Sequence, residues 1–274
     1  MKSIFNVFSF SIICLLVVSC HKDDNNYIED SEVIKRWSAH FTSAMVSPTV
    51  AGHADSGTFN MELHANNSIT FDLYDSSLIS GDALTGAFIR AGDPVTNGPI
   101  VLNLNPRISG RYLSGVIPNV RQSLVDSLLD NTNDLYFELQ SSRVPTGVAR
   151  AQLNLDVVAA FNVPLTGQEE VPPVITTATG NAYLRLTSNQ VLYSNVTVAN
   201  VEPNDVMNMA HIHKAPRGAN GPIIVPLVAS PAEFGVTRKT TVDQATFNSL
   251  LNDPIYVNAH SVLVPTGKIR GQIR

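Results

Sequence analysis

The sequence predicts an all-β fold, built as two tandem β-sandwich domains with Greek-key-like connections and one short helix in each domain. Two observations lead to this prediction. Charged residues make up only 15% of the 274 residues, and Val, Thr, Asn, Ser, Gly and Pro are frequent, which favours strands and turns over long surface helices. In addition, short motifs recur in the same order at a nearly constant spacing, which indicates a duplicated domain.

The duplication is carried by four pairs of motifs. The spacing between partners is 123 residues for the first two pairs and falls to 120 for the last. We therefore expect a boundary near residues 156–160, with domains at 33–156 and 157–274. The pairs are Ser56–Phe59 with Thr179–Ala182, Asn97–Val101 with Asn220–Ile224, Ser127–Asp130 with Ser249–Asn252, and Val144–Gly147 with Val264–Gly267.

Strands of the second copy follow from the pattern of apolar residues. Apolar and polar positions alternate along residues 181–186 and 191–201, as on a strand with one buried face. Short β-branched runs at 223–228 and 255–264 predict two further strands, the second closed by the turn signal Pro265–Gly267. Many short strands separated by turns indicate a sandwich or a partly closed barrel.

One short helix is expected in each copy, at residues 122–129 and 242–251. In the second of these, large apolar side chains such as Leu250 keep a helical spacing. Asp243 or Thr241 is placed to cap the first turn of that helix.

The N-terminal residues predict export and anchoring. Residues 1–19 combine a basic start with a short apolar run, as a signal peptide does. Leu15–Cys20 resembles a bacterial lipobox, in which Cys20 becomes the lipidated first residue, and the alternative is an ordinary secretory signal that contains a Cys. His21–Asn26 resembles the surface-export signal of Bacteroidota lipoproteins, so we expect residues 20–32 to be a lipidated flexible tether. These features predict an outer-membrane lipoprotein that is exposed at the cell surface and held by lipid chains.

Charge and motif content exclude several classes of function. The formal net charge is −5 and no basic stripe is present, so nucleic acid is not an expected partner. Both cysteines, Cys14 and Cys20, lie in the first twenty residues, which leaves no disulfide and no catalytic cysteine in the predicted domains. We find no phosphate-binding Gly loop, no nucleophile elbow and no zinc-protease motif, and we assign no catalytic residue.

Five stretches of the second copy together form a specific pattern: Leu165–Pro173, Ala210–Lys214, Asn220–Ile224, Tyr256–Ser261 and Pro265–Gln272. The pattern resembles the CHRD domain, the module named for the repeats in chordin. The resemblance covers residues 160–274, while residues 33–155 match it more weakly, through the repeat. It implies an all-β fold. In animal chordin these domains belong to an extracellular binder of growth-factor ligands, and for bacterial members the resemblance implies no established reaction.

Three histidines of the second copy form a candidate metal site. His211 and His213 are two residues apart in a predicted strand, so both side chains point to the same face. His260 lies in a second predicted strand that could pair nearby. Three imidazoles on two rigid strands suit zinc or copper with a fourth position open. The His-x-His pattern is also similar to the copper ligands of copper–zinc superoxide dismutase, but the remaining ligands and the disulfide are absent, so redox catalysis does not follow.

The first copy provides an internal comparison for these histidines. The motif spacings place Phe88, Arg90 and Gln140 at the three equivalent positions, so all three histidines are missing together. Joint loss is what a shared site predicts. Three interpretations remain open: the histidines hydrogen-bond and order the loop at residues 214–222, they hold a metal ion, or they contact a ligand without metal.

Other polar residues are expected to have structural roles. The Glu169–Glu170 pair is interpreted as part of a solvated loop, and Asn220–Pro222 as a turn. Arg150 and Arg270, which recur after equivalent turns, are expected to serve at an edge or as caps. We expect the remaining histidines to be exposed, namely His21, His40, His53 and His64.

Together these features predict a non-enzymatic binding or adhesion lipoprotein. Its partners would be the membrane, through the lipid anchor, and an extracellular protein, glycan or metal at the histidine face of the second domain. The first copy would serve as a spacer. The alternative is a metalloenzyme, using copper or zinc on the same three histidines, and a third interpretation is a purely structural stalk.

Overall fold

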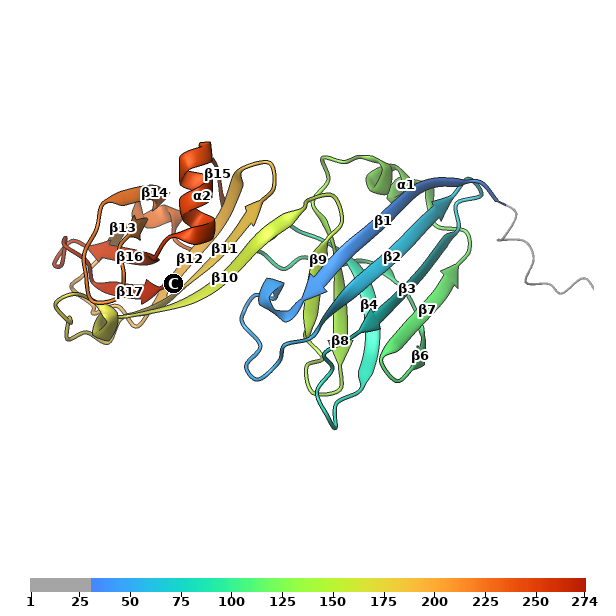
Figure 1. Cartoon of the computed structure of the whole chain (residues 1–274), viewed down its shortest axis with the longest axis horizontal. Coiled ribbons are helices and arrows are strands. Elements are labelled where there is room, and N and C mark those ends of the chain that lie inside the picture. The colour runs from blue at the N-terminus through green and yellow to red at the C-terminus, as the bar shows by residue number, and fades with distance from the viewer. Residues whose placement is uncertain (1–30) are drawn as a thin grey trace, which may run out of the picture.

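The structure is a computed structural model that describes residues 31–274. These residues form two antiparallel β-sheet domains joined end to end (Figure 1). The predicted signal peptide, the predicted lipidation site Cys20 and most of the predicted tether lie outside the described residues. No helix in residues 31–274 has the length and hydropathy needed to cross a membrane.

Within the described part of the chain, the first sheet has nine strands in the spatial order β5-β4-β8-β9-β1-β2-β3-β7-β6. A short 3₁₀ turn, Ser43–Met45, follows the first strand. The strands are β1 Val33–Thr42, β2 Ser56–His64, β3 Ile69–Asp75, β4 Leu84–Ala91, β5 Ile100–Asn103, β6 Arg107–Ser109, β7 Tyr112–Ile117, β8 Leu135–Ser141 and β9 Ala149–Gln152.

The second sheet has eight strands within residues 157–274, in the order β14-β13-β16-β17-β10-β11-β12-β15. Two 3₁₀ turns, Gly167–Glu169 and Pro231–Glu233, lie in its loops. The strands are β10 Val157–Thr166, β11 Thr179–Thr187, β12 Val191–Ala199, β13 Met207–Lys214, β14 Ile223–Val228, β15 Arg238–Thr241, β16 Ile255–Ser261 and β17 Ile269–Gln272.

The two sheets repeat the same topology. In chain order, the strands β10 to β17 of the second sheet correspond to β1, β2, β3, β4, β5, β7, β8 and β9 of the first. Corresponding strands occupy the same places in the two sheets, and β6 is an additional edge strand of the first sheet. The register repeats as well: Phe88 pairs with Glu138 in the first sheet, and His211 pairs with Asn258 in the second. The sequence offsets therefore identified structurally equivalent positions correctly.

Each sheet folds into two halves that enclose a hydrophobic core. In the second domain the halves β10-β11-β12-β15 and β14-β13-β16-β17 meet at a single pair, Thr166 with Arg270. Buried residues of both halves, such as Leu184 and Ile212, belong to one core cluster. Strands pair out of chain order, since β16 lies beside β13. The all-β prediction is confirmed.

The two helices of the described chain lie where the sequence placed them. The first, α1, spans Gln122–Leu129. The second, α2, spans Gln244–Asn252, and Asp243 caps it by accepting a hydrogen bond from the Thr246 amide at 2.7 Å. The helix therefore starts two residues after the predicted position 242, because Asp243 serves as the N-cap.

The domains contact one another through the face of β11 that points away from the core. Arg185 is fully buried there and donates to the carbonyl of Met45 at 3.2 Å and to Asn162 Oδ1 at 2.8 Å. Tyr183, on the same face, packs in a small apolar cluster with Val95 of the first domain. Hydrogen bonds and apolar contacts thus fix the two domains against one another.

Candidate metal site in the second domain

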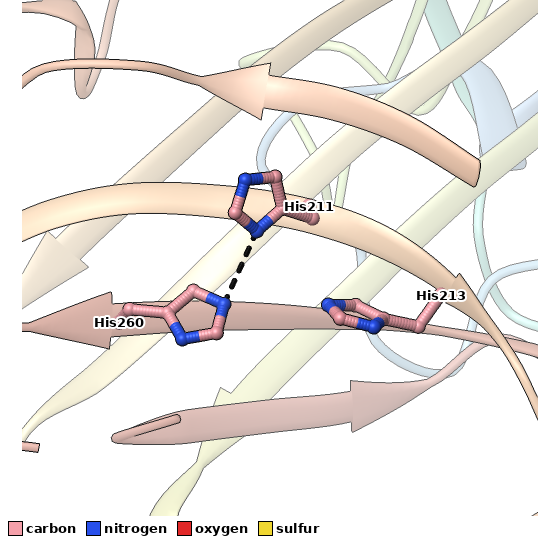
Figure 2. A group of neighbouring side chains, drawn as sticks. All are labelled: His211, His213 and His260. Carbon is pink, nitrogen blue, oxygen red and sulfur yellow. Dashed lines mark hydrogen bonds between the residues drawn. The ribbon is translucent and has the colours of Figure 1, made fainter. Parts of the chain in front are cut away.

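The three predicted histidines lie together on the outer face of two paired strands (Figure 2). His211 and His213 are on β13, and His260 is on the adjacent β16. The alternating residues of β13, Ala210 and Ile212, point the other way and are fully buried in the core. The strand pattern therefore separates a core face from a face that carries the imidazoles.

The geometry of the cluster is close to that of a metal site. One ligand nitrogen from each ring can be chosen so that all three atoms lie within 4.8 Å of one another. His211 Nδ1 and His260 Nε2 are 3.2 Å apart. Zinc–nitrogen bonds of 2.0–2.1 Å in a tetrahedron put two ligand nitrogens about 3.3 Å apart.

Backbone carbonyls determine which ring nitrogens carry protons. His213 Nδ1 lies 2.9 Å from the carbonyl oxygen of Gly221, and His260 Nδ1 lies 3.0 Å from that of Pro265. A carbonyl oxygen can only accept, so both Nδ1 atoms donate. In the neutral rings this leaves a lone pair on each Nε2, and the carbonyls of Gly221 and Pro265 hold the two rings in place, as backbone carbonyls do in many metal sites.

The structural interpretation and the metal interpretation of the histidines are therefore compatible. His213 orders the loop at residues 214–222, as the first interpretation predicted, and it uses only Nδ1 for this. Its Nε2 atom is buried and has no hydrogen-bond partner among the described residues. His260 Nε2 accepts from His211 Nδ1 when no metal is present. An orphaned buried lone pair requires an explanation, and a bound cation supplies one.

The imidazoles favour the neutral state that metal binding needs. Burial, together with the nearby His260 and His213 rings, lowers the pKa of His211 to about 4. Burial also lowers the pKa of His213 and of His260, although their backbone hydrogen bonds act in the opposite direction. All three rings are thus uncharged at neutral pH and keep their lone pairs.

The first domain fills the equivalent space with an ion pair. Arg90, at the position of His213, donates to the carbonyl of Gly98 at 2.9 Å and so orders the equivalent loop. Arg90 Nε also pairs with Glu138 Oε1 at 2.9 Å, and Gln140 donates to the same oxygen at 3.0 Å. With Phe88 at the position of His211, this face offers no imidazole. The loop can therefore be ordered without histidine.

Beside the histidines, the same face carries a buried polar layer. Arg270 stacks on Tyr256 at 3.4 Å and donates to Asn220 Oδ1 at 3.2 Å. Asn258 Nδ2 donates to Glu170 Oε2 at 3.4 Å. Glu170 is only 5% exposed, so the prediction of a solvated carboxylate is wrong for this residue. Burial raises the pKa of Glu170 to about 7, against the opposing effects of Arg270 and a backbone N–H.

Some other predictions for polar residues need correction. His64 is 5% exposed and hydrogen-bonds Thr70, and the His53 side chain is buried against Asp55, so the prediction of exposed rings holds only for His40 among the described residues. Arg150 is not at an edge. It is buried and stacks on a tyrosine of β8, as Arg270 does on β16.

Sequence reasoning missed one residue of the histidine face, Met209. This residue precedes His211 by two positions on β13 and pairs with His260 across the strands. Its counterpart in the first domain is Gly86, which pairs with Gln140 in the same register. The repeat comparison could have found it, because the methionine is missing from the first copy together with the histidines.

The fold and the site define an all-β two-domain protein with a three-histidine face on its second domain. Residues 161–273 match the family model of the CHRD domain. The matched segment includes the three histidines and the strands that carry them. No curated protein and no solved structure matches the chain.

Proposed function

We propose that this protein is a surface-anchored binding module whose second domain holds one transition-metal ion on His211, His213 and His260. The buried, unpartnered Nε2 atom of His213 carries the proposal, because it faces the other two rings. The ion would be zinc or copper, which are among the metals that neutral imidazoles suit. We propose no reaction for the site.

The first domain would act as a spacer that no longer binds metal. We propose that it is a degenerate CHRD-like domain. The matching order of eight strands supports the common origin. Phe88, Arg90 and Gln140 at the ligand positions support the loss of the site, because none of these side chains offers an imidazole lone pair.

Metal content tests the proposal. The purified full chain, incubated with Zn²⁺ or Cu²⁺ and dialysed, should retain about one ion per chain in elemental analysis. The variant His213→Arg should raise the dissociation constant by about 100-fold or more, since one of three ligands is lost. Arginine is chosen because Arg90 already makes the equivalent loop hydrogen bond in the first domain, and circular dichroism checks that the variant is folded.

The matched control is His40→Ala, which removes an exposed imidazole of the first domain. It should bind metal like the unchanged protein. Circular dichroism should be the same for all three proteins. The proposal fails if the unchanged protein retains neither ion, or if His213→Arg and His40→Ala bind metal equally well.

We further propose that the chain is a lipoprotein anchored at the outer membrane through Cys20 and exposed on the cell surface. The sequence of residues 1–26 supports this. Cells given radiolabelled palmitate should label the protein, and Cys20→Ser should abolish the label while Cys14→Ser keeps it. Protease added to intact cells should degrade the anchored protein. Label on Cys20→Ser, or full protection from protease, would contradict the anchor or its orientation.

A further inference from the structure

A methionine side chain lies beside the histidines on the same face of β13. Met209 lies on the same face of β13 as His211 and His213, and it pairs directly with His260. Cβ atoms of such cross-strand partners are about 4.5–5.5 Å apart. The methionine side chain is unbranched with three rotatable bonds, so its sulfur can reach the side of the cluster that His260 occupies.

Two features of Met209 are not explained by packing. The residue is 38% exposed, so its apolar side chain is not part of the core. In the first domain, a Cβ atom on the equivalent Gly86 would meet the ring of Phe88 at 2.9 Å. In the first domain the ring of Phe88 therefore covers this position. In the second domain Met209 stands in place of Gly86 and His211 in place of Phe88, so the position carries a thioether and an imidazole.

We infer that Met209 Sδ is a fourth ligand that makes copper, in the cuprous form, the preferred ion of this site. The inference rests on the proposed function, because it needs the three histidines to bind metal. Imidazoles alone serve zinc and copper alike, whereas a thioether is a soft ligand that selects Cu(I). A thioether would also supply the fourth ligand that the three imidazoles leave open.

The variant Met209→Leu tests this assignment in the full chain. It removes the sulfur at nearly constant volume, and such exchanges are well tolerated even in cores. Competition with the chromophoric chelator bathocuproine disulfonate should show a loss of Cu(I) affinity of about tenfold or more, equivalent to about 1.4 kcal/mol. Zn²⁺ affinity, measured with a zinc indicator, should change less than about twofold, since zinc gains little from a thioether.

X-ray absorption provides a second measurement. The Cu(I)-loaded protein should show a sulfur neighbour that is absent in Met209→Leu. If Met209→Leu keeps both the Cu(I) affinity and the spectrum while the histidines still bind metal, the methionine assignment is overturned and the proposed function stands. If the unchanged protein binds neither Cu(I) nor Zn²⁺, the proposed function fails and this inference fails with it.

Discussion

Replacing Lys268 by Met is expected to destabilise the second domain by about 3 kcal/mol, because a buried carboxylate would lose its counterion. Lys268 is 4% exposed, and its Nζ lies 2.6 Å from Asp205 Oδ2 and 2.6 Å from Glu202 Oε2. Burial opposes the charge on Lys268, but these two carboxylates outweigh it and raise the pKa of the lysine. Ser261 also donates to Asp205 at 2.6 Å, which ties the pair to the end of β16.

We place this effect at the low end of the values known for broken buried pairs, about 3–5 kcal/mol. The reason is that the Glu202 side chain is 36% exposed, so water reaches one side of the group. The control is Arg238→Met, since Arg238 and Glu233 are 37% and 41% exposed, and such pairs contribute about 1 kcal/mol or less.

Urea denaturation followed by circular dichroism measures both variants. The single tryptophan, Trp37, lies in the first domain, so its fluorescence follows that domain separately. Lys268→Met should lower the urea concentration at which the second domain unfolds. The midpoint reported by Trp37 fluorescence, which follows the first domain, should change much less. Equal, small losses in Lys268→Met and Arg238→Met would show that the Lys268 pair is not the buried interaction described here.

The second large effect concerns pH. Between pH 4.5 and 7 the folded protein keeps a proton on Glu170 that the unfolded chain releases, because burial raises the pKa of this carboxyl to about 7. Stability therefore falls as pH rises through this window. Glu170→Gln removes the contribution, so at pH 8 the variant should gain up to about 3 kcal/mol over the unchanged protein, while below pH 4 this advantage should vanish.

The quantity to measure is the difference in unfolding free energy between Glu170→Gln and the unchanged protein across pH 4–8. Using the difference cancels the titration of other groups, such as Asp75, whose pKa burial raises to about 6. Glu169→Gln, which removes the neighbouring carboxylate paired with Arg217, is the matched control. A difference for Glu170→Gln that does not grow with pH would contradict a buried carboxyl with a raised pKa.

The sequence contained enough information for the fold because its signals are local and repeated. Alternating apolar residues predicted β11 and β12, and a helical spacing with an N-cap at Asp243 predicted α2. The duplicated motifs even fixed the equivalence of β13 with β4. Strand ends were less certain: the predicted strand at 255–264 stops at Ser261, because a turn begins where Val262 and Leu263 point outward and are more than half exposed.

The site was predicted only in part because burial depends on contacts between distant segments. His211, His213 and His260 were identified from strand periodicity and from their joint absence in the first copy. The burial of Glu170 could not be foreseen, since it results from the packing of the loop after β10 against Asn258 on β16. The burial of Arg185 likewise depends on the other domain, which no pattern within β11 reveals.

The histidines and the hydrophobic core occupy opposite faces of the same strands. Small metal-dependent domains obtain their folding free energy from the ion and unfold without it. Here Ala210 and Ile212 are buried in the apolar core, on the face opposite the imidazoles, and the equivalent face of the first domain is built without histidine. The residence time of an ion would then be set by ligand exchange at the surface and not by the rate of unfolding. Such a protein could take up and release its ion repeatedly while remaining folded.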